Sequence, residues 1–164
     1  MGSSLTAMPL YRNRNMNTVK YKTNLKKRIF ATLIDYGVYA IITFVYIIYF
    51  GSDSNESSKS VSGVLTLPLL VVWFVYFVVI ESKYKATLGH QAFDLKVITA
   101  DRKEINFINA FKRHLVDPID FLFYGIPAII AIKNTEKHQR LGDLWSKTVI
   151  VDTSDIEQYP RNVD

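Results

Sequence analysis

Two long apolar stretches with a short polar segment between them dominate the pattern of the chain. The first runs from residue 29 to residue 50 and the second from about 61 to 80. As a helix, the first would span about 33 Å, against a hydrocarbon core of about 30 Å. The polar residues 51–60 suit a short solvated loop. The pattern therefore predicts a transmembrane helical hairpin, helix 1 over about 29–50 and helix 2 over about 61–80.

A third hydrophobic region, about 115–132, contains the turn-like sequence Gly125-Ile126-Pro127 and has basic residues on both sides. A single crossing would carry the second basic group to the outer side, against the charge bias. We therefore favour two short half-helices that enter and return around Gly125, with their broken backbone buried against protein. A simple third span is the alternative.

Two short segments have the composition of strands. Residues 93–98 alternate apolar and polar side chains, and residues 147–151 are rich in β-branched ones. We expect them to form a small cytoplasmic β-element. The predicted fold class is thus an α-helical membrane protein with a transmembrane hairpin and a third hydrophobic region, re-entrant or spanning. Residues 1–24 form a flexible basic segment, 25–152 the membrane domain and 153–164 a tail.

The basic residues predict the orientation. Before Asp35 the chain has no acid, and the hairpin loop carries only Lys59 as a base. The N-terminal basic residues are Arg12, Arg14, Lys20, Lys22, Lys26, Lys27 and Arg28. The positive-inside rule then places the N-terminus in the cytoplasm. The first apolar run is too long for a cleavable signal core, and the basic excess requires no nucleic acid.

Asp35 is the first candidate for chemistry, because it lies about two turns into helix 1. An ionisable residue at that depth is costly and marks a functional site or a buried ion pair. Thr32 and Tyr39 lie at i−3 and i+4 on the same face, so the three side chains could receive Na⁺. Arg28 is about 10 Å away along the axis, too far for contact unless it reaches inward.

Arg113 and Arg140 are the expected partners of Asp35, provided that the third hydrophobic region packs against helix 1. A desolvated aspartate without a partner would be neutral, whereas a paired one would stay ionised. A switch between the two states would couple the site to protons. A static Arg–Asp pair that fixes the packing of the helices is the alternative.

Asp117-Pro118-Ile119-Asp120 has the composition of a helix start. Asp117 would be the N-cap, Pro118 the first helical residue and Asp120 a first-turn acid favoured by the helix dipole. The functional alternative places Asp117 and Asp120 at the mouth of a cytoplasmic cavity, from which they relay protons or cations to Asp35.

Several kinds of chemistry have no residues to support them. The chain has no cysteine, and its three histidines are far apart, so we expect them at surfaces or interfaces rather than on a metal. No nucleophile with a base, metal-ligand cluster or phosphate loop is visible. We therefore expect no enzyme activity, no metal and no cofactor.

Five pieces of sequence resemble the RDD family of small bacterial membrane proteins, named for an arginine and two aspartates. They are residues 28–35, Thr87-Leu88-Gly89 with residues 95–98, Arg113, Leu141-Gly142-Asp143 and residues 148–151. The resemblance covers about 24–152 and departs from the family pattern at Asp94 and Lys147. It implies a multi-pass protein of the bacterial plasma membrane, for whose members transport of ions or other ligands has been proposed. Asp143, the second aspartate, would cap the last element or pair with an arginine.

The leading hypothesis is a transporter of a small cation or proton (Na⁺, Li⁺, K⁺ or H⁺). Asp35 would bind and release the ion, with an arginine as its internal competitor. A chain with so few crossings needs a homo-oligomer to enclose a pathway, and Gly37 and Ala40 would allow close approach of another helix. The alternative is a non-catalytic membrane module that assembles or regulates a partner, in which the same residues are structural ion pairs.

Overall fold

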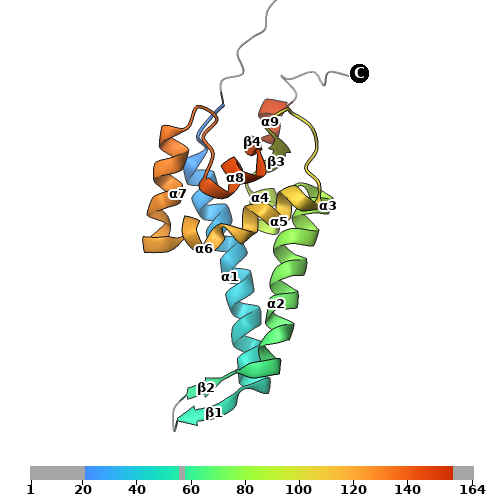
Figure 1. The fold of residues 1–164 in the computed structure, drawn as a ribbon, viewed down its shortest axis with the longest axis vertical. Coiled ribbons are helices and arrows are strands. Elements are labelled where there is room, and N and C mark those ends of the chain that lie inside the picture. The colour runs from blue at the N-terminus through green and yellow to red at the C-terminus, as the bar shows by residue number, and fades with distance from the viewer. Residues whose placement is uncertain (1–20, 56–57, 157–164) are drawn as a thin grey trace, which may run out of the picture.

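The computed structural model describes residues 21–55 and 58–156 of the 164-residue chain. Most of the predicted flexible segment 1–24 and most of the tail 153–164 lie outside the described residues. Two long helices form a hairpin along the long axis of the molecule (Figure 1). Residues 85–156, here called the head, form short helices and two strands around one end of this hairpin (Figure 1).

The first helix, α1 (Leu25–Phe50), begins four residues before the predicted start. Its end is marked by Gly51, whose backbone N–H donates to the Ile47 carbonyl at 2.8 Å. The only buried side chains of α1 are those of Arg28, Ala31 and Asp35, all in its first three turns. The rest of the helix presents apolar side chains outward, as a lipid-facing helix does.

The second long helix is continuous over residues 63–84 but changes its winding along the way. It comprises η1 (Gly63–Thr66), α2 (Leu67–Trp73), a π-helical segment η2 (Phe74–Val79) and α3 (Ile80–Tyr84). Pro68 lies in the first turn of α2, where its missing N–H costs no hydrogen bond, so the helix does not break. The helix ends one turn later than predicted.

Both long helices are long and apolar enough to cross a bilayer. Their large apolar side chains are exposed along most of their length. A helix that is apolar on all sides requires lipid or protein around it. The two helices of the predicted hairpin are therefore present, with the length and composition of membrane spans.

The connection between the two helices differs from the prediction. Residues 51–60 were expected to form a solvated loop, but they contain the antiparallel strands β1 (Ser52–Asn55) and β2 (Ser58–Ser60). Ser52 pairs with Ser60 and Asp53 with Lys59. Strand pairing satisfies backbone groups that a loop would leave to water.

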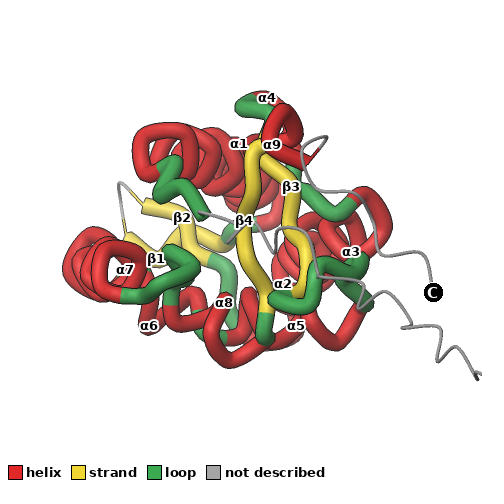
Figure 2. The backbone as a smooth tube through the Cα atoms, turned by 90° about the horizontal axis from the view of Figure 1, so that it is seen from above, coloured by secondary structure: helices red, strands yellow, loops and turns green. Residues whose placement is uncertain are grey.

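The predicted pair of strands in the head is confirmed. β3 (Leu95–Thr99) and β4 (Thr148–Asp152) pair antiparallel, with Leu95 opposite Asp152 and Thr99 opposite Thr148 (Figure 2). The apolar core lies between this sheet and the nearest turns of the long helices. Its members are Ala31, Val78, Leu95, Val97, Ile105, Ala110 and Ile150. The rest of the head consists of α4 (Leu88–Ala92), α5 (Phe107–Leu115), α6 (Asp117–Asp120), α7 (Leu122–Asn134), α8 (Leu141–Ser146) and α9 (Thr153–Ile156).

The third hydrophobic region contains the turn that the sequence predicts. Phe123, Tyr124 and Gly125 all have positive φ, and the chain turns there between α6 and the regular part of α7. At about 1.5 Å per residue, α7 spans at most about 20 Å, less than a bilayer core. α7 then runs beside α1 towards the end where α1 begins (Figure 1). The alternative of one straight helix across 115–132 is wrong, because α5, α6 and α7 divide this region.

The contact between α1 and α4 depends on a glycine. A Cβ atom on Gly89 would lie 2.1 Å from the Ala31 carbonyl oxygen and 2.8 Å from Asp35 Cγ. Only glycine allows the two backbones to approach this closely. Gly37, which we expected at a helix contact, would place a Cβ with no heavy atom within 4 Å.

We expect Gly89→Ala to destabilise the protein by about 1–3 kcal/mol, because α4 must move away from α1. Thermal unfolding of the purified protein in detergent would measure the loss. Gly37→Ala is the matched control, since it has room for a methyl group and replaces a helical glycine at a gain of up to about 1 kcal/mol. Equal stability of the two variants would contradict the close packing of α4.

Candidate functional site

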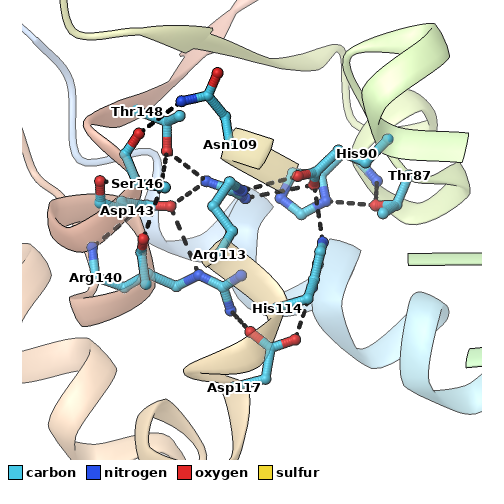
Figure 3. Close-up of polar contacts among 12 residues, drawn as sticks. Thr87, His90, Asn109, Arg113, His114, Asp117, Arg140, Asp143, Ser146 and Thr148 are labelled. Atoms are coloured by element: carbon cyan, nitrogen blue, oxygen red, sulfur yellow. Dashed lines mark hydrogen bonds and ion pairs between the residues drawn. The ribbon is translucent and has the colours of Figure 1, made fainter. Parts of the chain in front are cut away.

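A network of buried ion pairs joins the long helices to the head, and Arg113 of α5 is its centre (Figure 3). The side chain has no exposed surface. Its Nε donates to Glu81 Oε1 at 2.8 Å, and its Nη1 donates to Asp143 Oδ1 and, at 3.3 Å, to Thr148 Oγ1. One guanidinium therefore connects α3, α8 and β4.

Asp143 performs both of the roles between which the sequence left a choice. Its carboxylate accepts the backbone N–H of Arg140 at 3.1 Å, which caps the start of α8. The same carboxylate pairs with Arg113 and, at 2.7 Å, with Arg28 Nη2. Arg28 also donates to the His138 carbonyl at 2.5 Å, so its guanidinium faces the head. Although burial opposes ionisation, the arginines hold the pKa of Asp143 below its usual value.

Asp117 does not cap its own helix; Val116 occupies that position, and no side-chain cap forms. The Asp117 carboxylate instead accepts from the Tyr36 hydroxyl at 2.7 Å and pairs with Arg140 Nη1 at 2.9 Å. Burial would raise the pKa of Asp117, but Arg140 and His114 lower it overall.

Asp120 belongs to α6 but binds the backbone at the start of α8. Its two oxygens accept the backbone N–H groups of Leu141 and Gly142 at 3.0 and 2.9 Å, at the start of α8. Asp120 and Asp117 are both buried, and neither lines the cavity of the head. The alternative placement at a cavity mouth is therefore not what the structure has for this cavity, which lies between α1 and α7.

His114 completes the network between the two carboxylates of Asp117 and Glu81. Its Nδ1 lies 2.7 Å from Asp117 Oδ2, and its Nε2 lies 3.3 Å from Glu81 Oε2. Burial alone would lower the pKa of His114, but the two carboxylates raise it to about 9. His114 is therefore protonated at neutral pH; its Nδ1 donates to Asp117, and its Nε2 forms an ion-pair contact with Glu81 without a hydrogen bond.

The charges of this network balance. Its cations are Arg28, Arg113, Arg140 and protonated His114, and its anions are Glu81, Asp117, Asp120 and Asp143. Desolvating a charge is costly, so a buried ion is tolerated only when a partner of opposite sign and hydrogen bonds compensate for the lost water. Each of these charges has a partner of opposite sign within the network, although Arg140 Nε and His114 Nε2 form no hydrogen bond.

Asp35 lies outside the network, and its expected pairing with an arginine is wrong. Among the described residues its partners are polar groups of α2–α4 and the connection before α4. Gly89 N–H donates to Oδ1 at 2.7 Å, and the Tyr76 hydroxyl donates to the same oxygen at 3.0 Å. Thr87 Oγ1 donates to Oδ2 at 2.5 Å, with His90 Nδ1 at 3.3 Å from that oxygen.

The oxygen set that we expected for Na⁺ does not form. Tyr39 turns its hydroxyl to the Leu69 carbonyl at 3.3 Å, and Thr32 lies in the wall of a cavity. The hydroxyls beside Asp35 belong to Thr87 and Tyr76, and both direct their protons at the carboxylate. A carboxylate surrounded by donors is better suited to exchange a proton than to coordinate a metal cation.

Thr87 connects Asp35 to His90 in a way that restricts the positions of the protons. Its Oγ1 lies 2.5 Å from Asp35 Oδ2 and 2.6 Å from His90 Nδ1. A hydroxyl has one proton to donate, so when Thr87 donates to Asp35, His90 must donate to Thr87. The opposite arrangement has a protonated Asp35 donating to Thr87, which donates to His90. Moving both protons along this chain transfers one proton between imidazole and carboxylate.

His90 is buried, contrary to the expectation of a surface position, and so is His114. Desolvation lowers the pKa of His90 below its usual value, although Asp35 and Glu81 partly oppose this effect. The imidazole also forms part of the wall of a cavity of about 190 Å³ between α1 and α7. Arg28, Thr32 and Arg140 lie in the same wall.

The fold and the site define a membrane-type protein with two long apolar helices and a buried arginine–carboxylate network. The model of the RDD family matches residues 23–147, and the chain belongs to this family. Comparisons with curated proteins and with solved structures found no match.

Sequence reasoning missed several members of the site, although weak signals for some of them exist. Glu81 directly follows an apolar run that we ended at Ile80, so a longer helix would have included it. His114 stands three residues before Asp117, a spacing that places the two side chains on one side of a turn. Thr87 belongs to a piece of the family resemblance, but nothing local indicates its role, and Tyr76 carries no local signal, because their partner Asp35 is distant in the sequence.

The raised pKa of His114 predicts a dependence of stability on pH. A raised folded pKa gives a contribution that is complete below the unfolded value of about 6.5 and is lost as pH rises through about 9. We expect His114→Gln to lower stability at pH 6 by on the order of 3 kcal/mol, with the difference from wild type shrinking towards pH 9.5.

Thermal unfolding across pH 6–9.5 would measure this difference. His138→Gln is the control, because His138 is only partly buried and contacts a backbone carbonyl, not a carboxylate. A constant gap between wild type and His114→Gln across this range would show that folding does not raise the pKa of His114.

Proposed function

We propose that this RDD-family protein transfers protons through Asp35, Thr87 and His90 in exchange for a small cation. The observation that carries the proposal is the bridging position of Thr87 Oγ1, 2.5 Å from a carboxylate and 2.6 Å from an imidazole. A carboxylate and an imidazole that share one hydroxyl can exchange a proton without moving any backbone.

The absence of an arginine beside Asp35, among the described residues, supports the same proposal. An adjacent guanidinium would add a permanent positive charge, whereas the groups around Asp35 are neutral donors, which stabilise the carboxylate by hydrogen bonds, and an imidazole that can supply a proton. Each arginine of the network is paired with a carboxylate other than Asp35, so none of the three takes the place of the ion beside Asp35. This replaces the expected Asp35–arginine switch with an Asp35–His90 pair.

The second candidate is a membrane module that assembles or regulates a partner without transport. The specific observation in its favour is the balanced network around Arg113, which fixes the head on the long helices. In that reading the Asp35 hydrogen bonds hold α4 against α1 and no proton moves. The two candidates differ in whether the protein carries a flux.

The proposal includes a location in the bacterial plasma membrane, with the long helices crossing the bilayer and the N-terminus in the cytoplasm. Lys26, Lys27 and Arg28 at the start of α1, against the single base Lys59 in the connecting hairpin, support this orientation. The apolar outer faces of the two helices leave room for further copies of the chain, and we propose a homo-oligomer.

We expect proteoliposomes with the wild-type protein to show an internal pH change when Na⁺, K⁺ or Li⁺ is added. Thr87→Val should reduce this flux at least about tenfold, because it removes the hydroxyl that connects the carboxylate to the imidazole. Thr87→Ser keeps the hydroxyl and should retain the flux. Asp35→Asn, which cannot exchange the proton, should abolish it.

Each variant would first be shown to be folded by its thermal unfolding. No flux in wild-type liposomes with intact protein would reject transport and favour the assembly module. Equal flux in Thr87→Val and Thr87→Ser would reject the relay, even if Asp35 were required.

The orientation predicts which positions a membrane-impermeant thiol reagent reaches. The chain has no native cysteine, so an introduced cysteine is the only thiol of the protein that the reagent can label. Ser60→Cys, in the hairpin between the long helices, should be labelled in intact cells. Asn134→Cys and Thr153→Cys, both in the head, should be labelled only after permeabilisation. Labelling of the two head positions in intact cells would overturn the proposed orientation.

A further inference from the structure

The cavity between α1 and α7 has walls that suit a hydrocarbon chain. Ile29 and Leu33 of α1 face Ile129 and Ile132 of α7 across it. The cavity extends over about eight residues of each helix, or about 12 Å. Its volume of about 190 Å³ exceeds the roughly 150 Å³ of an apolar protein cavity that binds benzene. It is open on one side.

The charged residues of this cavity have one sign. Arg28 and Arg140 lie in its wall, and no acidic side chain does among the described residues. Arg140 Nε has no hydrogen-bond acceptor; the nearest carboxylate oxygens, of Asp120 and Asp143, lie 3.7 Å away. That nitrogen is itself buried beside these carboxylates, so the preference of the wall for an anionic group comes only from the sign of its two charged side chains.

Two further basic residues, Lys26 of α1 and Lys133 of α7, lie next to residues of the cavity wall. Lys26 directly follows Leu25 and Lys133 directly follows Ile132, and both lysines are exposed. The start of α1 and the end of α7 lie at the same end of the molecule (Figure 1). In the proposed orientation this end is at the cytoplasmic surface, where anionic headgroups attract basic residues.

We propose that the cavity binds one acyl chain of an anionic phospholipid from the surrounding bilayer, with Lys26 and Lys133 holding the headgroup. The inference rests on the proposed membrane location and is independent of proton transfer. The apolar walls accept the acyl chain. The basic residues of the wall, Arg28 and Arg140, and those of the rim, Lys26 and Lys133, select the charge of the headgroup. The bound chain lies against the imidazole of His90 and limits the access of water to that end of the relay.

Native mass spectrometry of the purified full chain would count retained lipids, with phosphatidylglycerol and phosphatidylcholine of identical acyl chains as probes. We expect the wild type to retain phosphatidylglycerol in preference. Ile129→Trp fills the cavity and should remove one bound lipid. Ile130→Trp is the matched control, because the neighbouring Ile130 lies on α7 outside the cavity and is exposed.

The rim is tested separately. Lys26→Gln and Lys133→Gln should each reduce the preference for phosphatidylglycerol roughly fivefold, the equivalent of about 1 kcal/mol for a lysine near an anionic surface. Lys83→Gln, which removes an exposed base from α3, should not change it. Loss of ion flux in Asp35→Asn with normal lipid retention would leave the lipid site intact, so the two proposals fail separately.

Equal lipid retention by Ile129→Trp and Ile130→Trp would overturn the lipid site. So would a wild-type preference for phosphatidylcholine. A dimer that dissociates only in Ile129→Trp, with no lipid retained by the wild type, would assign the cavity to a second copy of the chain and would also overturn the proposal.

Discussion

The burial of Arg113 is the constraint on which the rest of the structure depends. Its guanidinium has no exposed surface, so carboxylates from other elements must neutralise it. Glu81 supplies one from α3 and Asp143 supplies another from α8. Removing either partner would leave an uncompensated charge in the interior, which typically costs about 3–5 kcal/mol. The requirement fixes α5 and α8 against the second long helix and thereby fixes the position of the head.

The burial of the Asp35 carboxylate is compensated in a different way from that of the Arg113 guanidinium. The carboxylate is held by neutral donors and the His90 imidazole, without an arginine among the described residues. Gly89 makes this possible, because only a residue without a side chain lets its N–H approach Asp35 so closely. The first long helix therefore carries two buried ionisable groups with opposite behaviour. Arg28 is fixed by a partner of opposite charge, whereas in the function that we propose Asp35 shares a proton with His90.

The sequence predicted the elements better than it predicted their contacts. The two apolar runs, the strands β3 and β4 and the turn at Gly125 follow from local composition, which one sequence displays directly. The partners of Asp35 do not, because Thr87 and His90 lie more than fifty residues away. Three candidate arginines and four candidate aspartates were visible in the sequence, but spacing relates residues only within one helix. The short antiparallel strands in the hairpin were missed because their serine-rich composition is typical of a loop.

The balanced network also explains why the relay can be confined to a few atoms. Arg113 and Glu81 both act on His90, in opposite directions, and they are paired with each other. Their effects on the imidazole therefore oppose each other, while Thr87 and Asp35 are the side chains that His90 contacts directly among the described residues. The arginines of the network hold the head on the long helices, whereas Asp35 has no arginine partner among the described residues. In the function that we propose, the arginines therefore keep the scaffold rigid and Asp35 is the group that exchanges a proton.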